Sequence, residues 1–103
     1  MTTIPIDAYI LDTLLPDLVG HDRMPSAALL YLHLFRRCYR APEAGVQVSL
    51  TDLVLGTGLS KRSVQSALGL LTQRRLITVT RESATAIPHY ALKRPWLRFG
   101  RRE

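Results

Sequence analysis

The clearest repeat of apolar and polar positions lies in the middle of the chain, from Ser49 to Ile77. Apolar residues recur there at helical spacing in two runs: Leu50, Leu53 and Val54, and then Val64, Ala67, Leu68 and Leu71. Gly56 and Gly58 separate the runs and permit the positive-φ turn that joins two steeply crossed helices. Ser60 is the expected N-cap of the second helix. The pattern therefore predicts a short helix, a glycine turn, and a longer helix from Ser60 to Arg74.

The polar face of the longer predicted helix carries no carboxylate. From Ser60 to Arg75 the chain has no Asp or Glu, whereas a solvated helix face usually mixes both signs of charge. The residues on this face are Arg62, Gln65, Ser66, Gly69 and Gln73. Arg, Gln and Ser donate hydrogen bonds to bases and phosphates, and phosphates would repel a carboxylate. The face therefore indicates DNA, with a two-helix turn in an unrelated small helical domain as the simpler alternative.

Two further helical patterns precede this region. Residues from Ile4 to Leu18 form an apolar stripe with acids on the other side, and Pro16 is expected to end that helix. The run from Pro25 to about Arg40 is apolar over most of its girth, which indicates a central helix touched on several sides. The acidic segment either covers one side of the core or contributes a dimer contact, and both interpretations stay open.

Short alternating stretches on either side of the two helices predict a small sheet. Val46 to Val48 is one expected strand; Leu76 to Arg81 and Ile87 to Leu92 are two more, joined by a polar tip at residues 82–86. Pro88 marks the return strand as an edge strand or delays its pairing. The predicted fold is mainly α with a small β-hairpin.

The stretch T-G-L-S-K-R-S-V-Q-S-A-L-G-L-L, followed by this hairpin, resembles the winged helix-turn-helix DNA-binding domains of bacteria and phages. The family pattern is matched at four positions: Gly58, Leu59, Ser60 and Val64. The chain departs from it at Val54, where the family has a small residue, and at Arg75, where a glycine often ends the second helix. The resemblance covers roughly Ser26 to Leu92. It implies a domain at 25–93, preceded by an acidic helical segment at 1–24 and followed by a basic tail at 94–103.

Charge is unevenly distributed along the 103 residues. The chain has 14 basic and 8 acidic side chains, a net charge of +6, and its length suits one domain. Residues 1–25 hold four aspartates and one arginine, net −3, whereas the rest holds 13 basic and four acidic residues, net +9. Twelve of the 14 basic residues are Arg, which binds phosphate and guanine bidentately. This balance favours a polyanionic partner.

The resemblance and the charge together lead us to expect sequence-specific binding of double-stranded DNA by a homodimer, in transcriptional regulation. The expected base contacts are Arg62, Gln65 and Ser66, with Gly69 and Gln73 on the same face; the expected phosphate contacts are Lys61, Ser63, Thr72, Arg74 and Arg81. Two alternatives remain: a replication-initiator module of a plasmid or phage, and a protein-interaction winged helix inside a larger complex.

Patterns for catalysis, cofactors or metals are lacking in the sequence. His21, His33 and His89 are far apart and have no metal-ligand spacing, and Cys38 is a single cysteine expected to be buried. We therefore expect no enzyme activity, no cofactor and no metal. No apolar run is long enough for a membrane span and no signal peptide is visible, so a cytoplasmic protein without a membrane partner is expected.

Two basic clusters have local explanations. Arg36, Arg37 and Arg40 fall in the last turns of the central predicted helix, where cations suit the negative end of the helix dipole. Contact with phosphate is the minority interpretation for them. In the tail, Trp96 and Phe99 are expected to fold back onto the helices, although its basic residues would also suit a DNA backbone.

Overall fold

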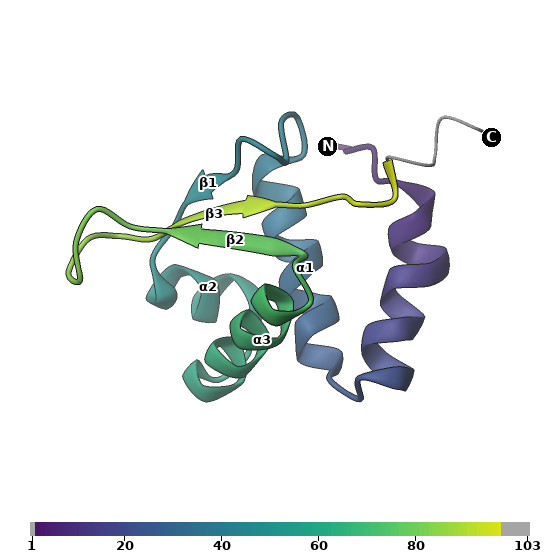
Figure 1. The fold of residues 1–103 in the computed structure, drawn as a ribbon, viewed down its shortest axis with the longest axis horizontal. Coiled ribbons are helices and arrows are strands. Elements are labelled where there is room, and N and C mark those ends of the chain that lie inside the picture. The colour runs from purple at the N-terminus through teal and green to yellow at the C-terminus, as the bar shows by residue number, and fades with distance from the viewer. Residues whose placement is uncertain (1, 98–103) are drawn as a thin grey trace.

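The computed structural model describes residues 2–97, which form a mainly helical domain with a small antiparallel sheet (Figure 1). The elements are η1 (Ile10–Leu14), η2 (Asp17–His21), α1 (Pro25–Cys38), β1 (Val46–Gln47), α2 (Leu50–Thr57), α3 (Lys61–Gln73), β2 (Ile77–Thr80) and β3 (His89–Leu92). The predicted class, mainly α with a small β-hairpin, is confirmed. The N-terminal segment is residues 2–24, and the hairpin is β2, β3 and the residues between them.

α1 is the central helix, as predicted, because it contacts η2, α2, α3, β1 and β3. Figure 1 shows the N-terminal segment on one side of α1, with α2, α3 and the hairpin on the other. The helix ends at Cys38, two residues before the predicted end. Leu29 is 50% exposed, whereas Leu30 and Leu34 are fully buried in the core.

The helical backbone of the N-terminal segment continues through Pro16, so the predicted break there is wrong. Pro16 has helical angles, φ −57° and ψ −34°, between two π-helical turns. In η1 the N–H of Leu15 bonds to the carbonyl of Ile10, five residues back. In such a wide turn the carbonyl four residues back no longer points at the proline ring, which relieves the clash that proline causes in an α-helix.

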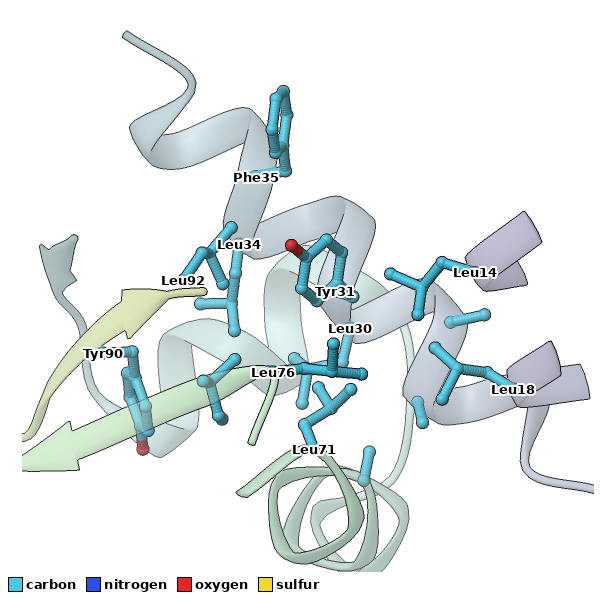
Figure 2. Close-up of a cluster of buried hydrophobic side chains, with 14 of the residues drawn as sticks. Leu14, Leu18, Leu30, Tyr31, Leu34, Phe35, Leu71, Leu76, Tyr90 and Leu92 are labelled. Carbon is cyan, nitrogen blue, oxygen red and sulfur yellow. The ribbon is translucent and has the colours of Figure 1, made fainter. Parts of the chain in front are cut away.

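The N-terminal segment shares the single core of the domain. Ile10, Leu14 and Leu18 are buried, and Figure 2 shows Leu14 and Leu18 pointing toward α1. The other labelled core residues come from α1, α3 and the hairpin region: Leu30, Tyr31, Leu34, Phe35, Leu71, Leu76, Tyr90 and Leu92 (Figure 2). The interpretation that this segment covers one side of the core is therefore confirmed.

Gly58 and Ser60 define the turn between α2 and α3. Gly58 ends α2 in the left-handed conformation, φ +78°, and the hydroxyl of Ser60 accepts the N–H of Ser63 at 3.1 Å at the start of α3. Both features agree with the predicted turn. α2 itself begins at a second serine cap, where the hydroxyl of Ser49 accepts the N–H of Asp52 at 3.1 Å.

Gly56 has a different role from the one expected, because it lies inside α2 and does not have a positive φ. A Cβ atom at this position would lie 2.4 Å from Cε1 of His33 on α1. Gly56 therefore permits close packing of α2 on the imidazole ring, whereas Gly58 alone supplies the turn.

The passage from α3 to β2 uses a left-handed residue without glycine. Arg75 has φ +58°, and the N–H of Leu76 then bonds to the carbonyl of Leu71 at 2.9 Å. A non-glycine residue in this conformation costs roughly 1–2 kcal/mol. The chain thus makes the sharp turn at the position where the resembling family often has glycine.

The sheet has the order β1-β3-β2, with both pairs antiparallel. β3 begins at His89, directly after Pro88, so the proline delays the pairing of this strand. β3 is the central strand of the sheet and not an edge strand. Gly45 precedes β1 with φ +78°, and a Cβ atom there would lie 2.2 Å from the carbonyl oxygen of Tyr90. The pairing of β1 with β3 therefore depends on a bare backbone at residue 45.

The start of the tail folds back onto the N-terminal segment, as expected for Trp96. Its Nε1 donates to Asp7 at 3.0 Å, and its ring stacks on Tyr9 with centroids 4.8 Å apart. Arg94 binds the carboxylates of Glu43 at 2.7 Å and Asp7 at 3.2 Å. Phe99 and the other tail residues from 98 onward lie outside the described residues. No helix within residues 2–97 combines the length and apolar character that crossing a bilayer requires.

Candidate nucleic-acid interface

α3 has one buried and one exposed face, in the predicted phase. Val64, Ala67 and Leu71 are fully buried, and α3 packs chiefly against α1. Leu68 was expected to be buried but is only partly so, because it lies at the margin of α3 where a groove begins. The buried stripe fixes which side chains of α3 face solvent.

The exposed face of α3 gathers most of the predicted contact residues. Its exposed members are Lys61, Arg62, Gln65, Ser66, Gly69, Thr72 and Gln73. A Cβ atom at Gly69 would meet nothing within 4 Å, so this part of the helix offers bare backbone to an approaching surface. The resulting face carries two cations in its first turn, Lys61 and Arg62, and neutral hydrogen-bonding side chains beyond them.

Two of the predicted phosphate contacts use their hydroxyl groups within the helix. Ser63 is partly buried, and its oxygen accepts a bond from the hydroxyl of Ser60 at 3.0 Å. Thr72 donates its hydroxyl to the carbonyl of Leu68 at 2.7 Å. Because that donor is occupied, Thr72 is a weaker candidate for phosphate than Lys61, whose charged group is exposed.

The structure corrects the expected role of Arg74. Its guanidinium donates to a carboxylate oxygen of Asp17 at 2.6 Å and to one of Asp22, and the side chain is 32% exposed. Both aspartates belong to the N-terminal segment, so Arg74 fastens the end of α3 to that segment. A guanidinium bound by two carboxylates is not a free cation for phosphate, and we remove Arg74 from the candidate interface.

Replacing Arg74 by alanine is expected to lower the free energy of unfolding at pH 7 by about 1–2 kcal/mol, because two charged hydrogen bonds are lost. The hydrogen bond from His21, and then Arg74, hold the pKa of Asp22 below its ordinary value, against an opposing effect of burial. A carboxyl group with a lowered folded pKa stabilises above its unfolded pKa, and this contribution is lost as pH falls through the folded pKa.

The unmodified chain should therefore lose stability from about pH 4 downward, and Arg74→Ala should lose less over the same range. Urea unfolding of both proteins at pH 7 and pH 3 measures this difference. Equal stabilities of the two proteins at pH 7 would show that the ion pairs contribute nothing.

A groove of about 420 Å³ separates α3 from the hairpin. Gln65 and Leu68 of α3 form one wall, while Arg81 and Ile87 of the hairpin form the other. Arg81 is exposed and makes one long hydrogen bond of 3.4 Å to the carbonyl of Ala84. The predicted base reader Gln65 and the predicted phosphate contact Arg81 thus border the same groove.

Sequence reasoning missed the apolar part of this groove. Leu50 at the start of α2, together with Ile87 and Pro88 of the hairpin, lines it beside the polar groups. No local sequence pattern predicts that the start of α2 contacts the hairpin, because about 37 residues separate the two in the chain. The groove combines apolar walls with an amide and a guanidinium.

Metal-ligand clusters and the single cysteine were the remaining features to place in the structure. Within residues 2–97 there is no cluster of three His, Cys, Asp or Glu side chains able to hold a metal ion. Cys38 donates its thiol to the carbonyl of Leu34 at 3.1 Å, and burial raises the pKa of that thiol. A buried thiol in this state is a structural hydrophobe and a poor nucleophile.

A scan against protein-family models found no match for this chain. Searches of curated proteins and of solved structures gave no match either.

Proposed function

We propose that this protein binds double-stranded DNA in a sequence-specific manner, as a winged helix-turn-helix transcriptional regulator. The observation that carries the proposal is the exposed face of α3, which holds donors and no carboxylate, beside a groove bordered by Arg81. In this proposal α2 and α3 form the helix-turn-helix, α3 enters the major groove, and the hairpin is the wing along the sugar-phosphate backbone.

The proposed contacts follow from the chemistry of each exposed side chain. Arg62 would fork to O6 and N7 of guanine, and Gln65, about one turn later, would pair with N6 and N7 of adenine. Lys61 and Arg81 would bind phosphates on either side of these bases. Gly69 would let the helix backbone approach the groove closely, because no side chain intervenes.

Selection of bound sequences from a random duplex pool provides the probe for this function. On the selected duplex, Arg62→Ala and Gln65→Ala should each weaken binding by about 1–3 kcal/mol, with little effect on a scrambled duplex. Arg81→Ala should weaken both duplexes similarly and lower the salt slope by about one. Arg23→Ala is the matched control, because this exposed arginine lies in the loop before α1.

The possible outcomes separate the alternatives. Equal losses on both duplexes for all three variants would indicate non-specific DNA binding. If all three variants and the Arg23→Ala control bind both duplexes as the unmodified chain does, the basic face serves another partner. A protein-interaction domain then becomes the better proposal. An enriched motif alone would support a regulator and a replication-initiator module equally.

The homodimer and the cytoplasmic location expected from the sequence remain proposals. On the N-terminal segment, Leu11 and Val19 are 48% and 44% exposed and offer an apolar surface to a second copy. Deletion of this segment is unsuited to testing a dimer, because it would also remove Ile10, Leu14 and Leu18 from the core.

A further inference from the structure

A second group of arginines lies at the C-terminal end of α1. Arg36, Arg37 and Arg40 are exposed and surround a shallow hollow of about 330 Å³, whose floor includes Tyr39 and Gly45. We call these three arginines the α1 patch. The helix dipole explains why cations are tolerated there, but it does not explain why three guanidinium groups share one hollow.

The α1 patch has no acidic counterpart among residues 2–97. No carboxylate in that part of the chain lies within 4.0 Å of the three guanidinium groups, whereas Arg74 and Arg94 each bind two carboxylates. Arg40 bonds to the hydroxyl of Tyr39 at 3.3 Å, a neutral partner. Arg74 and Arg94 thus have carboxylate partners within the chain, whereas the guanidinium groups of the α1 patch are open to an external anion, as are those of Arg23, Arg62, Arg75 and Arg81.

Arg37 is held in place by a neutral acceptor. Its Nε donates to Nε2 of His33 at 2.8 Å, and Gly56 of α2 packs against the Cε1–Nε2 edge of the same ring. Burial, and then the charges of Arg37 and Arg36, lower the pKa of His33, so the ring is neutral at pH 7 and accepts this bond. Because Nε alone is used, the two terminal amino groups of Arg37 remain available to a phosphate.

The end of α1 that carries the α1 patch points away from α3. In Figure 1 this end, which leads to β1, is at the top of the view, and α3 is at the bottom. Val64, Ala67 and Leu71 of α3 are buried and α3 packs on α1, so the exposed face of α3 is turned away from α1. A straight duplex on that exposed face would therefore lie on the side of α3 away from the α1 patch.

We propose that the α1 patch is a second nucleic-acid contact, which holds the phosphate backbone of a second duplex, so that one chain bridges two DNA segments. Among residues 36–45 none is a large exposed apolar side chain, so a partner would be held by charge, as a sugar-phosphate backbone is. Protein interfaces centre on well-packed and fully desolvated pockets, whereas this hollow is shallow. The inference rests on the proposed function, because the first duplex is the one bound at α3.

The test uses energy transfer between a donor-labelled selected duplex and an acceptor-labelled scrambled duplex, titrated with the full chain. Arg36→Gln/Arg40→Gln should bind the selected duplex within about twofold of the unmodified chain and weaken capture of the scrambled duplex by about tenfold. Arg23→Gln/Lys93→Gln removes two exposed charges elsewhere and should leave both events unchanged.

Several results would overturn the second contact while leaving the first in place. These are capture of no second duplex by the unmodified chain, or undiminished capture by Arg36→Gln/Arg40→Gln. If the unmodified chain captures no second duplex but binds phosphatidylglycerol vesicles through the α1 patch, the patch would belong to a membrane surface. That result would also overturn the second nucleic-acid contact. If Arg36→Gln/Arg40→Gln abolishes all duplex binding and Arg62→Ala does not, both this inference and the contact at α3 fail.

Discussion

Replacing Leu71 by alanine is expected to lower the free energy of unfolding by about 2–5 kcal/mol, a large share of the stability of a domain of this size. Leu71 of α3 is fully buried, and Figure 2 shows its side chain directed into the core cluster. Removal of its side chain takes away apolar burial and leaves a cavity that the packed neighbours close only in part.

Leu68→Ala is the matched control, because it changes the same side chain three residues earlier on the same helix. Leu68 is only partly buried and borders the groove, so its loss should cost about 1 kcal/mol. Urea unfolding at pH 7 measures both values. Equal costs would mean that α3 is rotated from the orientation described, and the assignment of Arg62 and Gln65 to the outer face would fall with it.

Gly45→Ala is expected to cost roughly 3–5 kcal/mol, because two separate effects combine at this residue. The backbone has φ +78°, which any residue with a Cβ atom adopts only under strain, and that Cβ atom would lie 2.2 Å from the carbonyl oxygen of Tyr90. Since the obstacle is backbone, no side-chain rotation relieves it. β1 would have to move away from β3.

Gly58→Ala separates the two effects. Gly58 has the same φ of +78°, but a Cβ atom there meets nothing within 4 Å, so only the conformational strain of about 1–2 kcal/mol is expected. Thermal unfolding gives the comparison, with about 4–8 °C for each kcal/mol in a domain of about this size. If Gly45→Ala proves no worse than Gly58→Ala, the close packing of residue 45 on β3 is not present in solution.

The features that the sequence predicted well are those decided within a few residues. The cap at Ser60 and the left-handed turn at Gly58 each depend on a hydrogen bond or a dihedral angle of the immediate neighbours. The buried stripe of α3, with Val64 and Leu71, likewise follows from one helical period. The exposed face of the candidate interface could be predicted for the same reason.

The features that sequence reasoning missed are those decided by partners far along the chain. The carboxylates that bind Arg74 lie 52 and 57 residues away, and no local pattern distinguished this arginine from Arg62. Gly56 looked like part of a turn because the His33 ring that it contacts is on another helix. Pro16 was predicted to end a helix, but the helical backbone accommodates it because the neighbouring turns are π-helical. The apolar periodicity of the sequence does not reveal such wide turns.

The ion pairs that fasten the N-terminal segment also affect the electrical polarity of the molecule. Residues 1–25 carry a net charge of −3, which Arg74 and Arg94 offset in part through Asp7, Asp17 and Asp22. Figure 1 places this segment at one side of the molecule and the hairpin at the other, so the side of the N-terminal segment is the less positive one. In the field of any polyanion such a molecule experiences a torque that turns the less positive side away. Encounters would then begin with the hairpin side foremost, at a rate that falls as salt shortens the screening length to about 10 Å at 0.1 M.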